Sequence, residues 1–201
     1  VPYIKKGKVV ALKAAGKQQG EIRGWHWGLA AEKQKLNQNV EFVFYTLEEP
    51  PYFRTEQMGS AVHAKSILSQ KEQISGVYIL EMIGYFDRKH IQEYPVGLKW
   101  FYPAHGNFIG AVSNLDSRQL GNGYCDAMKK LNRLDCQKLV APSFVAGVDF
   151  SDHLNYWNAG IPAVMITDTA FFRNKNYHTL NDTIATLNLN KIKDVIDGVV
   201  V

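Results

Sequence analysis

A short apolar segment near the carboxyl end of the chain, IPAVMI at residues 161–166, constrains the fold most strongly. It has the length of one buried strand, and residues able to transfer protons or bind ligands lie on both sides of it: Asp152, His153, Asp168, Tyr177, His178 and Asp182. Open α/β sheets gather ligands and catalytic groups in the loops at strand ends. The segment therefore predicts a strand of such a sheet, with a functional site in the loops beside it.

Other strands and helices alternate along the chain. Apolar patterns predict strands at residues 8–12, 40–47, 76–85, 108–112, 139–145 and 162–167, and helical spacing predicts helices at 28–36, 59–71, 118–131, 152–158 and 183–198. Asp182 resembles the N-cap of the last helix. Such alternation is typical of layered α/β folds. With 201 residues and no linker or repeat, we expect one domain over residues 1–201.

The composition excludes some classes of function. The net charge of +4 comes from scattered lysines without a basic stripe, so we expect no nucleic-acid partner. No apolar run approaches the roughly 20 residues of a membrane span. No signal-peptide pattern is visible, and the sequence leaves open whether the protein is cytoplasmic or exported. Cys125 and Cys136 do not match a CxxC zinc pattern, and two ordinary thiols or one disulfide both remain open.

Two adjacent carboxylates, Glu48 and Glu49, directly follow the strand predicted at residues 40–47. Neighbouring carboxylates repel each other when both are ionised in a partly buried site. A bound metal removes this conflict, because one carboxylate can coordinate it while the other acts as a general base on water. The alternative is a pair of solvated side chains in a turn.

Glu81 and His178 are further candidates. Glu81 interrupts the apolar run VYILEMIGY, and buried carboxylates are rare unless they are paired or bind a metal. A buried salt bridge or a solvent-facing strand end would also explain it. His178 is of a type that commonly binds zinc, and Asp182 could orient its second nitrogen or cap a helix. For His153 we favour a core histidine at the start of a helix.

Three segments together resemble the M28 family of zinc aminopeptidases. They read FVFYTLEEPPYFRTEQMGSAVHA, GVYILEMIGYF and GVDFSDHLNYWNAGIPAVMITDTAFFRNKNYHTLNDT, and they occur in the family's order. The resemblance covers about residues 28–198. It implies an α/β fold with a mixed, mostly parallel central sheet flanked by helices, like that of zinc exopeptidases. It also implies one or two zinc ions and a peptide substrate with a free amino terminus.

The resemblance assigns roles to individual residues. It implies that Glu48 is the general base and that Glu49, Glu81 and His178 are metal ligands, although the family usually has aspartate at the position of Glu81. The resemblance also places Tyr177 at the substrate. From the residues themselves we further expect Phe171 and Phe172 at the substrate, and Asp152 and Asp182 as supports behind the ligands. For the two phenylalanines, packing in the core is an open alternative.

The amino-terminal part departs from the family pattern. Family members carry a His-x-Asp motif after an early strand and an aspartate in the loop before the next helix. Here the two stretches read VVALKAAGK and QQGEIRGWHW, where Glu21 and His26 are the nearby residues able to coordinate a metal. The sequence predicts zinc-dependent removal of amino-terminal residues from peptides. Two alternatives remain, an inactive M28-like binding or structural module and a single-zinc acyl transferase of the glutaminyl-cyclase kind.

Overall fold

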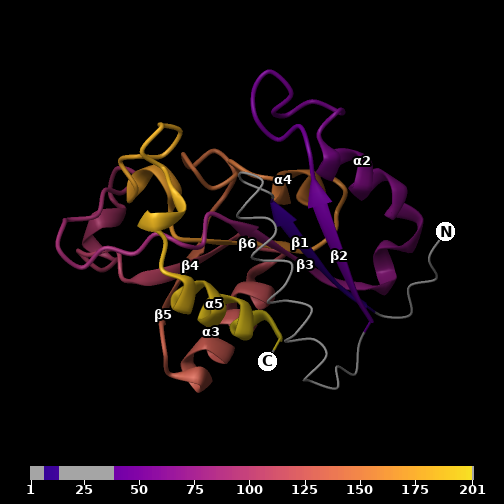
Figure 1. Cartoon of the computed structure of the whole chain (residues 1–201). Helices are drawn as coiled ribbons and strands as arrows, with labels where there is room; N and C mark the ends of the chain where they lie inside the picture. The colour runs from indigo at the N-terminus through magenta and orange to yellow at the C-terminus, as the bar shows by residue number, and fades with distance from the viewer. Residues whose placement is uncertain (1–6, 14–38, 201) are drawn as a thin grey trace.

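The computed structural model describes residues 7–13 and 39–200, and its centre is one six-stranded sheet (Figure 1). The strands are β1 (Gly7–Lys13), β2 (Asn39–Tyr45), β3 (Ile74–Glu81), β4 (Phe108–Ser113), β5 (Asp135–Val140) and β6 (Ala163–Thr167). Their order in the sheet is β2-β1-β3-β6-β4-β5. Every neighbouring pair is parallel except β4 and β6, which are antiparallel. This confirms the expected mixed, mostly parallel α/β sheet.

Helices cover both faces of the sheet (Figure 1). On one face α3 (Arg118–Leu131) and α5 (Leu189–Val200) pack over a core that includes Leu80 and Ile166. On the other face α2 (Gly59–Ser66) and α4 (His153–Asn158) pack over Ile79 and Ala163. Successive strand residues point to opposite faces, so each strand contributes to both cores. None of the helices in the described part of the chain is long and apolar enough to cross a bilayer.

The central strand β3 lies between β1 and β6, and its side chains are buried on both faces. This position explains its nearly continuous apolar sequence. The strand ends at Glu81 because the next residue, Met82, adopts a left-handed backbone conformation with φ 46°. The expected strand at residues 76–85 therefore stops four residues early, and this places a carboxylate at the strand end.

Two expectations about the elements are wrong. The strand expected at residues 139–145 is β5 at Asp135–Val140, because residues 142–145 form a turn in which the N–H of Val145 donates to the carbonyl of Pro142. Asp182 does not cap the last helix, which begins at Leu189. The side chain of Asn188 accepts a hydrogen bond from the N–H of Lys191 and serves as that cap.

The remaining expected elements agree with the observed ones to within a few residues. The exceptions are one helix that divides into two segments and one helix that lies outside the described residues. The helix expected at residues 59–71 divides into α2 and the 3₁₀ segment η1 (Leu68–Gln73). Three further 3₁₀ segments are η2 (Leu98–Trp100), η3 (Ala170–Phe172) and η4 (Ile184–Thr186). The helix expected at residues 28–36 lies outside the described residues.

Cys125 of α3 and Cys136 of β5 form a disulfide. Of the two alternatives that the sequence leaves open, the structure therefore has the disulfide. Because α3 also packs on β4 and β5, the bond ties this helix to the edge strand of the sheet.

Candidate active site

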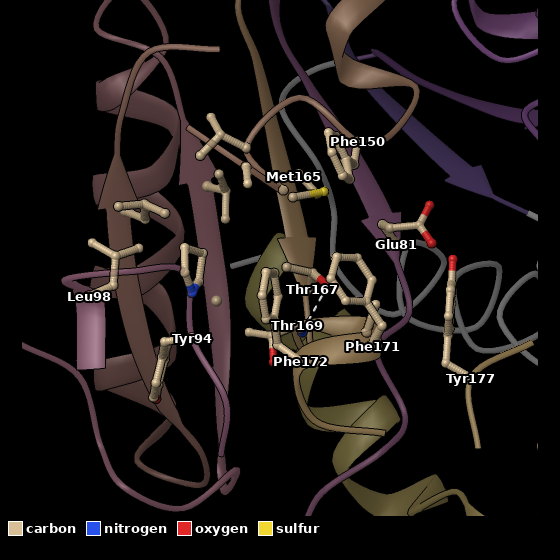
Figure 2. Close-up of a pocket in the computed structure, with 18 of the residues that line it drawn as sticks. Glu81, Tyr94, Leu98, Phe150, Met165, Thr167, Thr169, Phe171, Phe172 and Tyr177 are labelled. Atoms are coloured by element: carbon tan, nitrogen blue, oxygen red, sulfur yellow. Dashed lines mark hydrogen bonds between the residues drawn. The ribbon is translucent and has the colours of Figure 1, made fainter. Parts of the chain in front are cut away.

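A pocket of about 300 Å³ lies beside the carboxyl ends of β3 and β6 and extends across β4 and β5 (Figure 2). Its floor consists of alternate strand residues on one face of the sheet: Glu81 of β3, Met165 and Thr167 of β6, Gly110 and Val112 of β4, and Gln137 and Leu139 of β5. Its walls come from connecting segments, including Glu48, Glu49, Phe150, Tyr94, Leu98, Phe171, Phe172 and Tyr177. Most of these side chains are apolar, while the carboxylates come from the segments that end β2 and β3.

Glu48 and Glu49 reach the pocket from the turn after β2. Leu47 has φ 58°, a left-handed conformation that turns the chain before the two glutamates. The side chain of Glu48 is largely buried, and that of Glu49 is about half exposed. His178 Nε2 lies 3.1 Å from Glu49 Oε1, so two of the predicted metal ligands are in direct contact.

Glu81 is the last residue of β3 and is only 4% exposed. Its neighbour across the sheet is Thr167 of β6, and its Oε2 accepts a hydrogen bond of 2.7 Å from the hydroxyl of Ser151. In Figure 2 the carboxylate of Glu81 points toward the phenol of Tyr177. The burial excludes the solvent-facing alternative and leaves a carboxylate held at a strand end beside the pocket.

Aromatic side chains continue the wall next to these carboxylates. The rings of Tyr177 and His178 stack with centroids 3.9 Å apart, and His178 has φ 59°. The rings of Phe171 and Phe172 are 4.4 Å apart, and Phe171 lies 6.1 Å from Tyr177. Both phenylalanines line the pocket, which favours the pocket over the core alternative for them.

The two aspartates expected behind the ligands do not line the described pocket. Asp152 is fully buried, and its Oδ1 accepts a hydrogen bond of 2.5 Å from Ser60 of α2. Asp182 accepts a hydrogen bond of 3.0 Å from the side-chain amide of Asn174. Their supporting role behind the ligands stays a prediction.

His153, next to Asp152, is a fully buried core histidine, as we favoured from the sequence. Its Nε2 donates a hydrogen bond of 2.7 Å to the carbonyl of Val148, and its ring contacts Trp157 edge-on. Burial penalises the charged imidazolium and lowers the pKa of His153 to about 4. The ring is therefore neutral at physiological pH and serves to hold the segment that carries Val148 at the pocket.

The donor set of the described residues fits zinc in part. Zinc is bound by carboxylate and imidazole groups, and Glu49 and His178 supply one of each in contact. Over residues 7–13 and 39–200, no group of three or more His, Cys, Asp or Glu side chains converges closely enough to hold a metal ion. Glu21 and His26, the possible substitutes for the family's early ligands, lie outside the described residues.

Sequence reasoning missed a polar network beside the pocket. The buried Arg173 donates from Nε to Gln92 Oε1 at 2.8 Å, and Gln92 donates from Nε2 to Thr169 Oγ1 at 2.7 Å. Gln92 and Thr169 both line the pocket. The one signal in the sequence was a charged residue directly after the apolar pair Phe171 and Phe172.

Asp168 fixes the two segments that carry this network. Its carboxylate accepts hydrogen bonds from the N–H groups of Gly84, Tyr85 and Ala170 at 2.7–3.0 Å. Burial raises the pKa of Asp168 to about 6, although the nearby guanidinium of Arg173 and the three N–H donors favour the charged form. Asp168 was expected near the site from its place after a strand, and its observed contacts are with backbone at the edge of the pocket.

Comparison with known proteins gives one family and one curated relative. The family model that matches is Peptidase family M28, over residues 27–201. The relative is the uncharacterized protein YfbL of Escherichia coli strain K12, which is 44% identical over 163 residues. That match covers 80% of this chain and 50% of the relative, so the chain spans about half the length of the curated protein it matches.

Solved structures share the fold at low sequence identity. The LapA aminopeptidase of Legionella pneumophila matches with a TM-score of 0.66 at 19% identity, over 98% of this chain and 50% of that one. BSAP, a zinc aminopeptidase from Bacillus subtilis, matches with a TM-score of 0.63 at 16% identity, over 99% of this chain and 47% of that one. The glutaminyl cyclase of Porphyromonas gingivalis matches with a TM-score of 0.60 at 14% identity, over 98% of this chain and 72% of that one. The family model spans most of the chain and the fold agrees with it: this chain belongs to peptidase family M28.

Proposed function

We propose that this chain carries the catalytic machinery of a zinc-dependent aminopeptidase, which removes amino-terminal residues from peptides. The observation that carries the proposal is the pocket into which Glu48, Glu49 and Glu81 come from two separate segments, with His178 against Glu49. Membership of the M28 family supports a peptide substrate, and the likeness to zinc aminopeptidases supports zinc as the metal.

In this proposal Glu49, Glu81 and His178 would serve as ligands of one or two zinc ions. Glu49 and His178 are in contact, whereas the three side chains do not converge on one metal position within the described residues. Bound zinc supplies Lewis acidity, which polarises a scissile carbonyl and favours deprotonation of water. Glu48 accepts the proton of the attacking water and passes it to the leaving amine. Its position supports this role, because it is held in the pocket wall by the same turn as Glu49 and is shielded from bulk solvent. Tyr177 stacks on His178 and fixes the orientation of that ring.

The shape of the pocket supports a substrate with a free amino terminus. Glu81 and Tyr177 lie at one end of the pocket in Figure 2, and Tyr94 and Leu98 lie at the other. A positively charged α-amino group is attracted to the carboxylate end. The side chain of the same residue then extends along the apolar walls, where its burial contributes to binding.

The test combines zinc content with aminopeptidase rates on amino-terminal chromogenic amides. Glu48→Gln removes the proton acceptor, so we expect kcat to fall roughly 10²- to 10⁴-fold with the zinc content unchanged. Glu56→Gln, at an exposed position in the same connecting segment, is the matched control and should keep the full rate. His178→Ala should lower the zinc content. A protein that binds no supplied zinc, or a Glu48→Gln variant with the full rate, would contradict the proposal.

The fold shared with a glutaminyl cyclase makes one further assay informative. If the protein cyclises amino-terminal glutamine and cleaves no peptide, its activity is that of an acyl transferase and the proposed peptidase activity is wrong. Zinc binding with neither reaction would favour a binding module.

A further inference from the structure

The pocket is mainly apolar, but one part of its wall is polar. Gln92, Thr167 and Thr169 all line it, and Gln92 is only 6% exposed. The amide of Gln92 donates to the hydroxyl of Thr169, and the N–H of Thr169 donates to Thr167 Oγ1 at 3.0 Å. Figure 2 places Thr167 and Thr169 between the end with Glu81 and Tyr177 and the end with Tyr94 and Leu98. The polar strip therefore lies along the pocket, beyond the carboxylates.

Arg173 fixes the orientation of the Gln92 amide. A guanidinium has only donors, so the atom of Gln92 that faces Nε of Arg173 at 2.8 Å is the carbonyl oxygen. The nitrogen consequently faces Thr169. Arg173 is itself held rigidly, because it donates from one terminal nitrogen to the carbonyls of Phe108 and Tyr85 and lies 4.5 Å from the centroid of the Phe108 ring.

The oriented amide has hydrogen-bonding capacity left over. A side-chain amide offers two N–H donors and two acceptor lone pairs. The bonds to Arg173 and Thr169 use one acceptor site and one donor of Gln92. Within the described residues one N–H and one lone pair of Gln92 have no hydrogen-bond partner. Because Gln92 lines the pocket, a bound group could use them, and leaving them unpaired after water is displaced would be unfavourable.

We infer that the pocket selects a substrate whose amino-terminal residue is tyrosine over one that begins with phenylalanine. The inference rests on the proposed function and adds the identity of the side chain. An aromatic ring packs well against the walls that include Phe171 and Phe172. A phenol is both a donor and an acceptor, which matches the remaining N–H and lone pair of Gln92. Phenylalanine fills the same space but leaves the amide unpaired.

Other polar side chains match the pocket less well. An acidic side chain would gain less from Arg173, because the guanidinium already interacts favourably with the nearby carboxylate of Asp168. Short hydroxylic side chains do not fill a pocket of about 300 Å³. The combination of aromatic walls with one oriented amide therefore favours a phenol.

The test measures binding rather than catalysis. Isothermal titration calorimetry on the whole chain compares the affinities for tyrosine amide, phenylalanine amide and 4-fluorophenylalanine amide, the last of which has nearly the shape of tyrosine without its hydroxyl. We expect tyrosine amide to bind about tenfold more tightly than the other two, the effect of about one buried hydrogen bond. The comparison among ligands needs no variant, so it holds even if a substitution prevents folding.

Two variants assign the preference to its residue. Gln92→Leu should reduce the ratio of the tyrosine to the phenylalanine affinity to below twofold, because tyrosine amide loses its hydrogen-bond partner and phenylalanine amide no longer leaves a buried amide unpaired. Gln137→Leu is the matched control, because Gln137 lines the same pocket from β5 and should leave the tenfold ratio intact. Equal affinities in the unmodified protein, no binding of any amide, or loss of the ratio in Gln137→Leu rather than Gln92→Leu would overturn the inference.

Failure of the inference and failure of the proposed function give different results. Hydrolysis of tyrosyl and phenylalanyl substrates at the same kcat/KM, with equal binding of the two amides, would leave an aminopeptidase without this preference. If tyrosine amide binds preferentially but no peptide is hydrolysed, the proposed aminopeptidase activity is wrong and the inferred selectivity of the pocket is supported.

Discussion

The two faces of strand β6 show how differently one sheet is covered. Val164 and Ile166 point into the core beneath α3 and α5, where both are completely buried. Met165 and Thr167 point the opposite way and line the pocket. Helices bring regularly spaced apolar side chains and close the first face tightly. On the second face α2 and α4 cover one part of the sheet, and loops and short 3₁₀ segments cover the other part and leave a pocket of about 300 Å³ bordered by carboxylates and an amide.

The difference between the two faces shows which face of the sheet carries the candidate site. The residues that line the pocket are held from below by a rigid sheet and from the sides by connecting segments fixed by few, specific hydrogen bonds, such as those of Asp168 and Arg173. Binding residues in proteins are often placed in this way, on loops positioned by a rigid scaffold. Stability and recognition are therefore expected to depend on opposite faces of the same strands.

The largest expected effect comes from the core face. Ile166→Ala should lower the free energy of unfolding by about 4 kcal/mol, because it leaves a cavity in a packed core. Met165→Ala, one residue earlier, should cost less than half as much, since Met165 already borders open space. Urea unfolding of the two variants checks this. Equal losses of unfolding free energy in the two variants would contradict the proposed difference between the two faces.

The second prediction concerns pH and the face of the sheet that carries the pocket. The pKa of His153 is about 4 in the folded protein, below its ordinary value of 6.5. Between pH 6.5 and 4 the unfolded state binds a proton that the folded state does not. The free energy of unfolding should therefore fall as the pH falls through this range, by up to about 3 kcal/mol from this group. Urea unfolding between pH 4 and 8 measures the slope.

His153→Phe is the control for this slope. Phenylalanine fills a similar space and cannot titrate, so the variant should lose the part of the slope that belongs to His153. Asp168 acts in the opposite direction, because its raised pKa of about 6 makes the folded state hold a proton more tightly between pH 4 and 6. Asp168 is present in both proteins and cancels in the difference. A variant with an unchanged slope would contradict the assignment.

The third prediction concerns the covalent link on the core face. Replacing Cys125 and Cys136 together by alanine removes a cross-link that closes a loop with a sequence separation of 11. We expect a loss of about 2–3 kcal/mol, because the unfolded chain gains freedom. The affinity for tyrosine amide should stay unchanged, since neither cysteine lines the described pocket. Chemical unfolding measures the loss of stability, and calorimetry on the same sample measures the affinity for tyrosine amide. A weakened affinity would show that the two faces are coupled.

The smallest expected effect comes from the pocket floor. A Cβ added at Gly110 would lie 3.2 Å from the carbonyl oxygen of Thr167, a tight contact at the edge of the pocket. Gly110→Ala should cost about 1 kcal/mol in stability and weaken the binding of tyrosine amide by narrowing the pocket. Gly123→Ala, on the exposed side of α3 with free space around it, should instead stabilise the protein slightly. Unchanged affinity in Gly110→Ala would place the ligand elsewhere.

Local pattern was enough to predict most elements, and α3 has the same bounds as its expected helix, residues 118–131. The strand β5 was misplaced because its exposed positions leave only a weak apolar pattern, and its position is fixed by pairing with β4. The cap of α5 was misassigned because Asn188 and Asp182 both have the chemistry of a cap, and only the path of the intervening segment distinguishes them.

For the candidate site, the sequence alone determined which side chains are chemically able to act, since Glu48, Glu49, Glu81, Tyr177 and His178 stand out by type and by position after strands. Only the tertiary structure decided which of them meet. The contact of Glu49 with His178 and the orientation of Gln92 by Arg173 join segments far apart in the chain. Such contacts depend on the order of the strands in the sheet and on the path of the loops, and neither is encoded in the local periodicity of a segment.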